Sequence, residues 1–333
     1  MQWSTHSAQM KLLRQTSELA RPNANLPEPP QEARVFHLRW DRLGLVDPNS
    51  ISVPVTDTNT IKDAIYQARL GSGGTAFSFH PDGYFLTAAH VVQNVERGEL
   101  ILENTAGKSI LTQVISTNEC HDLALLKAIE PESAPYPYLR LATKSGSIDS
   151  PVVQYGFPAR NGRRYTSEPG TITARNNTAY GEVFGYEFNL SHNAGLGGGS
   201  SGGPFLNESL EVVGIVQTGG NFDIRHSTGT PVEEIARQLT GMFATSFQNG
   251  LGFEFRTLPG GVVKTTYIYP DSPAARAGLQ VGDLVKKIKS KGKVVFDSQG
   301  HRKLWKGEIC RAQTASDVYL EILREGRSLT IKL

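Results

Sequence analysis

The stretch Gly195-Leu196-Gly197-Gly198-Gly199-Ser200-Ser201-Gly202-Gly203-Pro204 is the most informative part of this sequence. Glycine adopts positive φ at little steric cost, so a glycine run lets the backbone turn sharply and approach a ligand. Successive N–H groups in such a turn converge on an anion. The run is consistent with an oxyanion site that has Ser201 as nucleophile, but a flexible Gly/Ser loop fits the same letters.

A dinucleotide-binding loop is a third interpretation, because Gly197 to Gly202 matches G-x-G-x-x-G. The match is weak. The preceding Ser191-His192-Asn193 does not read as a buried strand, and no βαβ unit surrounds it.

Two further segments carry residue types used in nucleophilic catalysis. His90 ends the apolar run that begins at Leu86, where an imidazole is packed on one side and open on the other; a structural histidine also fits there. Asp122 stands directly before the apolar run Leu123-Ala-Leu-Leu126, where a buried carboxylate needs a hydrogen-bond donor. Alone, Asp122 also fits a residue that caps the start of a strand.

Together these residues occur in the order His90, Asp122, Ser201, with gaps of 122−90 = 32 and 201−122 = 79 residues. The motifs Thr-Ala-Ala-His90, Asp122-Leu-Ala-Leu-Leu and Gly199-Ser-Ser-Gly-Gly-Pro resemble those of trypsin-like serine proteases of the chymotrypsin fold. The HtrA/Deg branch fits best, over about residues 70–240. The resemblance implies a mostly β fold: two six-stranded antiparallel β-barrels plus a small α+β PDZ domain.

The resemblance also implies roles for individual residues. Ser201 would attack a peptide carbonyl, His90 would transfer its proton, and Asp122 would orient the imidazole. The N–H groups of Gly199 and Ser201 would form the oxyanion hole. The implied substrate-binding residues are Gly195, Gln217, Thr218 and Gly219.

At two positions, 200 and 195, the residue differs from the one that trypsin-like proteases carry. Ser200 stands where secreted trypsins carry an acid and the HtrA branch carries Asn, so activation by a newly cut N-terminus is not expected. Gly195 stands where trypsins keep the carboxylate that selects Arg or Lys. We therefore predict a preference for small or aliphatic side chains at the cleavage site.

The last ninety or so residues resemble a PDZ domain. Gly250-Leu251-Gly252-Phe253 is similar to the loop that binds a peptide's C-terminal carboxylate, and Asp271 to Asp283 continues the resemblance. An ordinary strand start also fits the tetrapeptide. The resulting domain division is 1–34 for an N-terminal arm and linker, 35–242 for the protease domain and 246–333 for the PDZ domain.

Composition limits the partners. The 333 residues carry Lys+Arg 34 against Asp+Glu 32, a net charge of +2, so we expect no nucleic-acid partner. We expect no cofactor and no metal, because the adjacent Cys120 and His121 would point to opposite faces of a strand. The two cysteines, Cys120 and Cys310, imply no disulfide framework.

No apolar run is long enough for a signal peptide or a membrane span, so the sequence as written predicts a cytoplasmic protein. A periplasmic or organellar location would follow if the N-terminus is trimmed. The expected partners are protein or peptide substrates and, at the PDZ domain, C-terminal peptides. By family resemblance, a homo-oligomer would be a trimer.

The local patterns predict short strands throughout, a helix from Thr60 to about Gly71, and a helix that begins near Thr230 and stops at Gly241. The function these features favour is a serine endopeptidase of unfolded or C-terminally exposed proteins, with a place in protein quality control. Two alternatives stay open: an inactive PDZ-bearing pseudoprotease or holdase that binds peptides, and a small-ester hydrolase.

Overall fold

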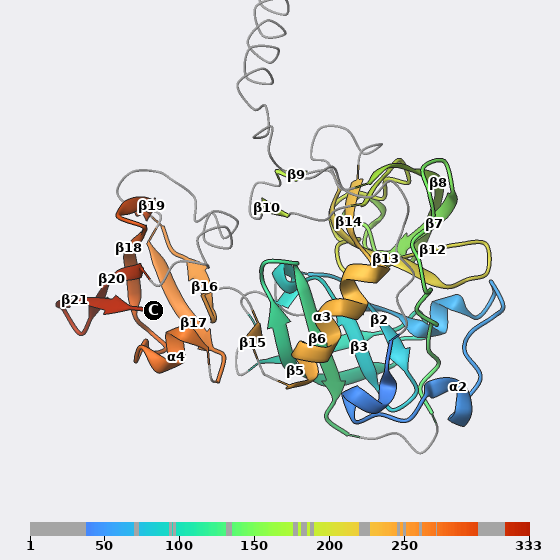
Figure 1. Cartoon of the computed structure of the whole chain (residues 1–333), viewed down its shortest axis with the longest axis horizontal. Helices are drawn as coiled ribbons and strands as arrows, with labels where there is room; N and C mark the ends of the chain where they lie inside the picture. Colours follow the sequence, from blue (N-terminus) through green and yellow to red (C-terminus); the bar gives the residue numbers. More distant parts are fainter. Residues whose placement is uncertain are drawn as a thin grey trace, which may run out of the picture. The chain divides into compact units, whose positions relative to one another are not determined.

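The computed structural model describes residues 38–69, 73–92, 95, 98–130, 135–175, 179–180, 185–186, 190–219, 227–244, 247–248, 251–259, 262–270, 272–298 and 317–333. These residues all belong to one compact unit, Ala33–Leu333. Strands dominate, as the sequence predicts (Figure 1). The expected arm, residues 1–34, lies outside the described residues.

Before the first barrel, the chain forms single turns of helix: η1 (Trp40–Leu43), α2 (Pro48–Ile51) and η2 (Ile61–Ala64). The helix predicted over residues 60–71 is wrong. After η2 the chain passes at once into strand β1, Ile65–Ala68, whose four side chains are all buried. A strand that is covered on both faces shows no alternation, and this removes the signal by which it is recognised.

The first barrel has six strands, closed by pairing of β5 with β6. A seventh strand, β15 (Phe247–Gln248), adds to β5 in parallel. Phe85, Leu102 and Leu126 are among the fully buried residues of its core. The six strands are β1 (Ile65–Ala68), β2 (Gly74–His80), β3 (Tyr84–Thr87), β4 (Glu99–Glu103), β5 (Ser109–Asn118) and β6 (Leu123–Ala128).

The second barrel also closes with six strands, in the order β11-β14-β13-β12-β7-β8. A buried cluster that includes Phe205, Val213 and Val216 fills it. Its strands are β7 (Pro151–Gly156), β8 (Thr166–Arg175), β11 (Leu190–His192), β12 (Pro204–Leu206), β13 (Val212–Gly219) and β14 (Ser227–Pro231). The short strands β9 (Ala179–Tyr180) and β10 (Gly185–Tyr186) pair with each other, and η4 is Ala159–Asn161.

Helix α3, Val232–Ala244, follows β14 directly and packs against β5 of the first barrel and β13 of the second. Ile235, Leu239 and Met242 are buried along one side of the helix. The predicted stop at Gly241 is wrong, because α3 continues through it to Ala244. Helix α3 therefore packs against both barrels.

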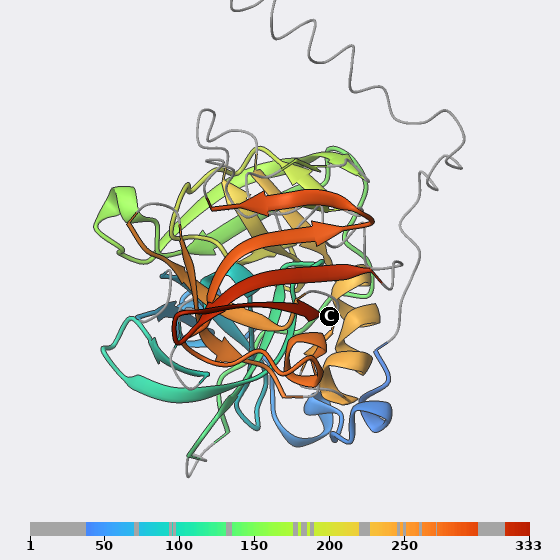
Figure 2. The ribbon, with the colours of Figure 1, turned by 90° about the vertical axis from the view of Figure 1, so that its left-hand side faces the viewer.

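The C-terminal sheet has the strand order β16-β17-β18-β20-β21, with β19 paired to β18, and Figure 2 shows its strands, coloured orange to red, lying side by side. Ser272 caps α4 (Pro273–Arg276) by accepting the Ala275 N–H at 3.1 Å. This sheet with a short helix is consistent with a PDZ-like domain. The strands are β16 (Phe253–Thr257), β17 (Val263–Ile268), β18 (Leu284–Ser290), β19 (Lys293–Asp297), β20 (Val318–Arg324) and β21 (Arg327–Lys332).

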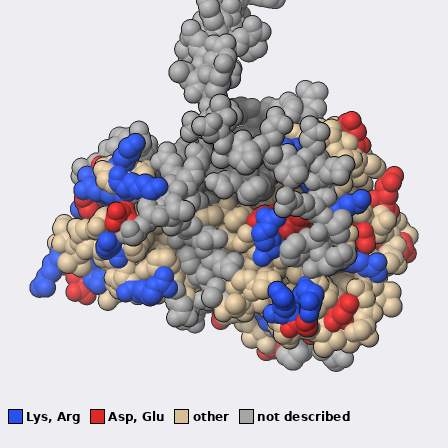
Figure 3. All heavy atoms as spheres, viewed as in Figure 1, with Lys and Arg blue, Asp and Glu red and all other residues tan. Residues whose placement is uncertain are grey.

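Charged side chains of both signs are interspersed on the face drawn in Figure 3. Several are paired on the C-terminal sheet, where Lys289 contacts Glu321 at 2.6 Å and Lys287 contacts Asp297 at 3.3 Å. No helix among the described residues is long and apolar enough to cross a membrane.

Candidate active site

His90 and Asp122 come from neighbouring parts of the first barrel. His90 lies in the single turn η3 (Ala89–Val92) after β3, and Asp122 lies directly before β6. One carboxylate oxygen of Asp122 accepts the His90 backbone N–H at 2.9 Å, and the other lies 2.7 Å from His90 Nδ1. Asp122 is fully buried whereas the His90 side chain is 22% exposed. The carboxylate thus fixes both the backbone and the ring of His90, and the ring reaches solvent.

The glycine run forms a tight turn between β11 and β12. Gly199 has φ +95, and a Cβ there would lie 2.6 Å from the Phe157 carbonyl oxygen. Gly202 has φ +82, and a Cβ would lie 2.1 Å from Thr87 Oγ1. Both positions require glycine, because the left-handed conformation and the close approach each exclude a side chain.

The two serines of the run have different surroundings. Ser200 is fully buried, donates from Oγ to the Gly197 carbonyl, and accepts the Gln154 side-chain amide at 2.9 Å. Ser201 is partly exposed, and its Oγ donates to the Gln217 carbonyl at 3.2 Å rather than to His90. Ser200 therefore fixes the turn from inside, and Ser201 presents the accessible hydroxyl.

Thr75 links the first barrel to this turn, a role that no sequence motif indicated. Its backbone N–H donates to the Ser201 carbonyl at 2.8 Å, and its Oγ1 donates to the Gly199 carbonyl at 2.9 Å. The same Oγ1 accepts the Phe157 N–H at 3.0 Å. Among the described residues, no protein group accepts a hydrogen bond from the N–H of Gly199 or Ser201.

The residues expected to bind substrate take different positions. Gly195 is buried, and its carbonyl accepts from Arg160 at 3.0 Å. The side chain of Gln217 points inward, where its amide donates to the carbonyl of His121 and to Thr230 Oγ1. Thr218 and Gly219 lie at the end of β13 and pair with β14. The Gln217 carbonyl accepts from Ser201 Oγ at 3.2 Å.

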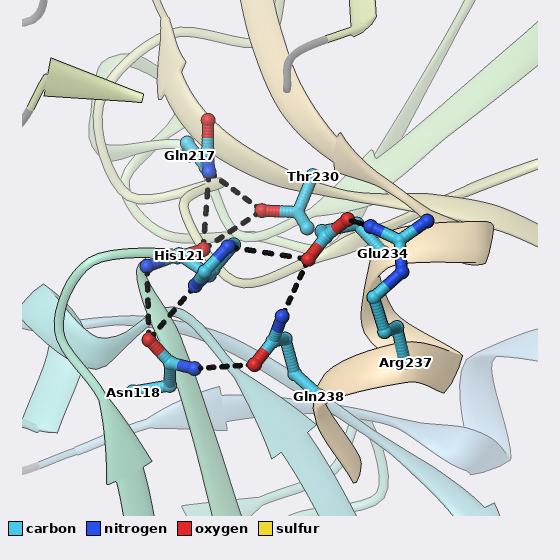
Figure 4. A network of polar contacts seen from close by, with 7 residues as sticks. All are labelled: Asn118, His121, Gln217, Thr230, Glu234, Arg237 and Gln238. Carbon is cyan, nitrogen blue, oxygen red and sulfur yellow. Dashed lines mark hydrogen bonds and ion pairs between the residues drawn. The ribbon is translucent and has the colours of Figure 1, made fainter. Parts of the chain in front are cut away.

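A polar network surrounds the turn that bears Asp122 (Figure 4). We call residues 118–122, which join β5 to β6, the Asp122 turn. The ring of His121 lies between Asn118 Oδ1, 3.0 Å from Nδ1, and Glu234 Oε1, 3.2 Å from Nε2. Glu234 also accepts from Gln238 at 2.5 Å and from Arg237. Burial raises the pKa of Glu234, but hydrogen bonds from His121 and Gln238 outweigh it, so the pKa is lowered.

The predicted carboxylate-binding tetrapeptide is described in part. Gly250 lies outside the described residues, and Gly252, with φ +82, precedes Phe253 at the start of β16. The Leu251 N–H donates to a carboxylate oxygen of Glu119 at 2.9 Å, in a buried contact. Glu119 belongs to the Asp122 turn.

Other polar residues have no part in this geometry. His192 is fully buried with its ring 4.8 Å from that of Phe205, and burial lowers its pKa to about 4. Within the described ranges, no group of three His, Cys, Asp or Glu is arranged to hold a metal. Cys120 is disulfide-bonded, contrary to expectation; Cys310, the other cysteine of the sequence, lies outside the described residues.

Comparison with known proteins agrees with this architecture. A family model described as a trypsin-like peptidase domain matches residues 74–215. The serine endoprotease DegS of Haemophilus influenzae is 26% identical over 280 residues, covering 80% of this chain and 77% of that protein. A probable periplasmic DegP-like serine endoprotease of Halomonas elongata is 28% identical over 284 residues, covering 78% and 55% respectively.

Among solved structures, a variant of the HtrA-type protease AlgW with a tripeptide is 20% identical, covers 82% of this chain and 93% of that chain, and gives a TM-score of 0.50. This likeness concerns the fold alone. With its two barrels, the chain resembles a trypsin-like peptidase, and the matched segment covers residues 74–215. The relatives that it matches are serine endoproteases of the DegS and DegP kinds. The chain spans about half the length of the DegP-type relatives, 54% to 56% in three cases.

Proposed function

We propose that the protein is a serine endopeptidase that hydrolyses unfolded or C-terminally exposed proteins, with His90, Asp122 and Ser201 as its catalytic residues. The observation that carries the proposal is the double contact of Asp122 with His90, at 2.9 and 2.7 Å. A buried carboxylate on Nδ1 fixes the tautomer that leaves Nε2 as the basic nitrogen. That is the arrangement a general base for a serine nucleophile needs.

In the proposed reaction, Ser201 Oγ attacks the peptide carbonyl while its proton passes to His90 Nε2. The imidazolium that forms is stabilised by the Asp122 carboxylate, and it then protonates the leaving amine. The N–H groups of Gly199 and Ser201 are proposed to bind the oxyanion. Each such donor typically contributes about 3 kcal/mol to transition-state stabilisation. The glycine requirement at position 199 supports this role, since it fixes the orientation of that peptide.

We infer that the substrate backbone adds to the end of β13. Thr218 and Gly219 pair with β14 on one side, and the other edge follows the Gln217 carbonyl that contacts Ser201. An extended peptide on this edge would pass the proposed nucleophile. With Gly195 in place of an acid, small or aliphatic side chains are the expected choice at the cleaved bond.

The C-terminal sheet is proposed to recognise peptide C-termini as a PDZ domain. The tetrapeptide Gly250 to Phe253 precedes and enters β16, and its Leu251 N–H already binds a carboxylate, that of Glu119. A free C-terminal carboxylate is the matching ligand for such N–H groups.

We infer that the protein works in an oxidising compartment such as the periplasm. Disulfides persist in oxidising compartments, and Cys120 is disulfide-bonded. The matched relatives of Halomonas elongata and Salmonella typhimurium carry the word periplasmic in their names. A cytoplasmic location, which the sequence as written predicts, is thus the less favoured one.

One observation favours the alternative of a peptide-binding pseudoprotease: the Ser201 hydroxyl donates to Gln217 rather than to His90. The test is incubation of the wild type and Ser201→Ala with an unfolded protein and, separately, with a small ester. We expect peptide fragments from the wild type and none from the variant. Suppressed aggregation without fragments would support the holdase, and ester turnover without fragments would support the esterase.

A further inference from the structure

We propose that His121, held as an imidazolium between Asn118 and Glu234, is a positioning residue that fixes the Asp122 turn in the conformation that presents Asp122 to His90. This inference rests on the proposed function, because it assigns a residue that supports the proposed catalytic pair. Neither His121 nor Glu234 stands in the three motifs that carry the resemblance to serine proteases.

The Asp122 turn needs external support. Asp122 has φ +51, in the left-handed region, which Asp adopts more readily than most residues when its side chain hydrogen-bonds locally; here both carboxylate oxygens are engaged by His90 instead. Strand β6 holds the chain after Asp122, and on the other side the preceding residue, His121, is where α3, β13 and β14 contact the turn. Contacts to His121 therefore bear directly on where the carboxylate points.

The hydrogen bonds around the His121 ring define its protonation. Asn118 Oδ1 accepts the His121 backbone N–H at 3.1 Å, and Asn118 Nδ2 donates to Gln238 at 3.0 Å, so the amide orientation is fixed from two sides. Oδ1 is also the atom that faces His121 Nδ1, so Nδ1 must donate. Nε2 faces a Glu234 carboxylate oxygen, so it must donate as well. A ring that donates from both nitrogens is an imidazolium.

Glu234 is a suitable counterion because it stays ionised. Its side chain is 3% exposed, and the hydrogen bonds that it accepts from His121, Gln238 and Arg237 favour the charged form. Among the described residues, the charged groups near His121 are Glu234 and its partner Arg237 on α3, with Glu119 and Asp122 in its own turn. From the described parts of β13 and β14, the neutral Gln217 and Thr230 contact it.

The backbone of His121 is held from the opposite side. Its carbonyl accepts from Thr230 Oγ1 at 2.9 Å and from the Gln217 side chain at 3.2 Å. The carbonyl of the same Gln217 accepts from Ser201 Oγ. Thus α3 holds the ring, β13 and β14 hold the backbone, and Gln217 touches both the Asp122 turn and the proposed nucleophile (Figure 4).

The test compares two buried carboxylates on the same turn of α3. Glu234→Gln and His121→Ala weaken or remove the ring contacts, whereas Glu233→Gln changes a carboxylate that binds Ser145 and Arg175 instead. The first readout is the rate at which a fluorophosphonate labels Ser201 in the full chain. The midpoint of chemical unfolding is measured for each variant as well, so that a loss of stability can be told from a loss of reactivity. Displacement of a catalytic group by about 1 Å costs up to about a hundredfold in rate.

We expect Glu234→Gln and His121→Ala to label roughly tenfold or more slowly, with the double variant no slower than either single one. Glu233→Gln should lose stability and keep its labelling rate. The proposal would be overturned if Glu234→Gln labelled at the wild-type rate. It would also be overturned if the labelling rates of all variants, Glu233→Gln included, fell in proportion to their lost stability.

A second readout separates this proposal from the proposed function. The Nδ1 proton of His90, in its 2.7 Å contact with Asp122, should give a low-field NMR resonance in the wild type. If the wild type fails to label, the proposed function fails. The positioning role then stands only if that resonance is present in the wild type and in Glu233→Gln and is lost in His121→Ala. Retention of the resonance in His121→Ala contradicts the role.

Discussion

The hydroxyl of Thr75 joins the first barrel to the backbone of the glycine turn, by its contacts with Gly199 and Phe157. Thr75→Val keeps the shape of the side chain but leaves two buried backbone groups without their partner. We expect the free energy of unfolding to decrease by about 1–3 kcal/mol. Labelling of Ser201 should also slow, because the Gly199 peptide is no longer held.

Thr112→Val is the matched control for this prediction. Thr112 is also fully buried in the first barrel, and its Oγ1 donates to the Leu100 carbonyl at 2.7 Å. It should lose stability to a similar extent and label at the wild-type rate. If the two variants label equally, Thr75 has no special connection to the glycine turn.

His192 makes a prediction about pH and stability. Burial lowers its pKa to about 4, whereas an unfolded chain titrates at about 6.5. Between these values the unfolded state binds more protons, so the free energy of unfolding falls as the pH falls from about 6.5 to about 4, by at most about 3 kcal/mol. Burial lowers the pKa of His80 too, with the same sign of effect.

The measurement is chemical denaturation of the wild type and His192→Leu over this pH range. Because His80 is common to both proteins, the difference between the two curves reports His192. We expect the variant to show a shallower decline on acidification. Parallel curves would mean that His192 is not held neutral in the folded protein.

At the scale of elements, the conformation of the glycine turn depends on Gly199. Gly199→Ala places a Cβ 2.6 Å from the Phe157 carbonyl at φ +95, so the turn must shift. We expect labelling to fall by roughly a hundredfold, as expected when an oxyanion donor is lost. Gly107→Ala is the control, since it has φ +79 with nothing within 4 Å. It should cost about 1 kcal/mol of stability and leave labelling unchanged; slow labelling in both variants would contradict the account.

Short strands with clear apolar runs were predictable, because the run that begins at Leu123 starts β6 at the same residue. Strand β1 was not, since its four residues are buried on both faces and follow letters typical of a helix start. The end of α3 was also missed. Packing of Leu239 and Met242 outweighs the roughly 1 kcal/mol cost of Gly241 inside the helix.

In the candidate site, too, some residues could be predicted from the sequence and others could not. His90, Asp122 and Ser201 stand in recognisable local motifs, so their neighbours in sequence identify them. Thr75 and His121 do not, because the contacts that tie them to other elements are with residues distant in sequence. Thr75 binds Gly199 at a separation of 124 residues, and His121 binds Thr230 at 109. Only the fold brings such pairs together, and no local pattern records them.

At the scale of the whole molecule, the contact of Glu119 with Leu251 joins the Asp122 turn to the segment that enters the C-terminal sheet. A peptide carboxylate bound at Leu251 has to displace this side chain. Glu119→Gln replaces a charged acceptor by a weaker neutral one. We expect a peptide with a free C-terminus to bind roughly threefold to tenfold more tightly to the variant.

Fluorescence anisotropy with a labelled peptide measures this affinity, and the same peptide with an amidated C-terminus is the control. The amidated peptide should bind weakly to both proteins. Unchanged or weaker binding of the free peptide to Glu119→Gln would mean that Glu119 does not compete for the Leu251 N–H.

The central claim is that Ser201, rather than Ser200, is a nucleophile activated beside His90 and Asp122. Fluorophosphonate labelling followed by mass mapping tests it most directly, on the wild type and Ser201→Ala, with and without a C-terminal peptide. We predict modification at Ser201 in the wild type and none in the variant. Absence of labelling under every condition, or labelling at Ser200, would contradict the account and leave peptide binding as the function of this chain.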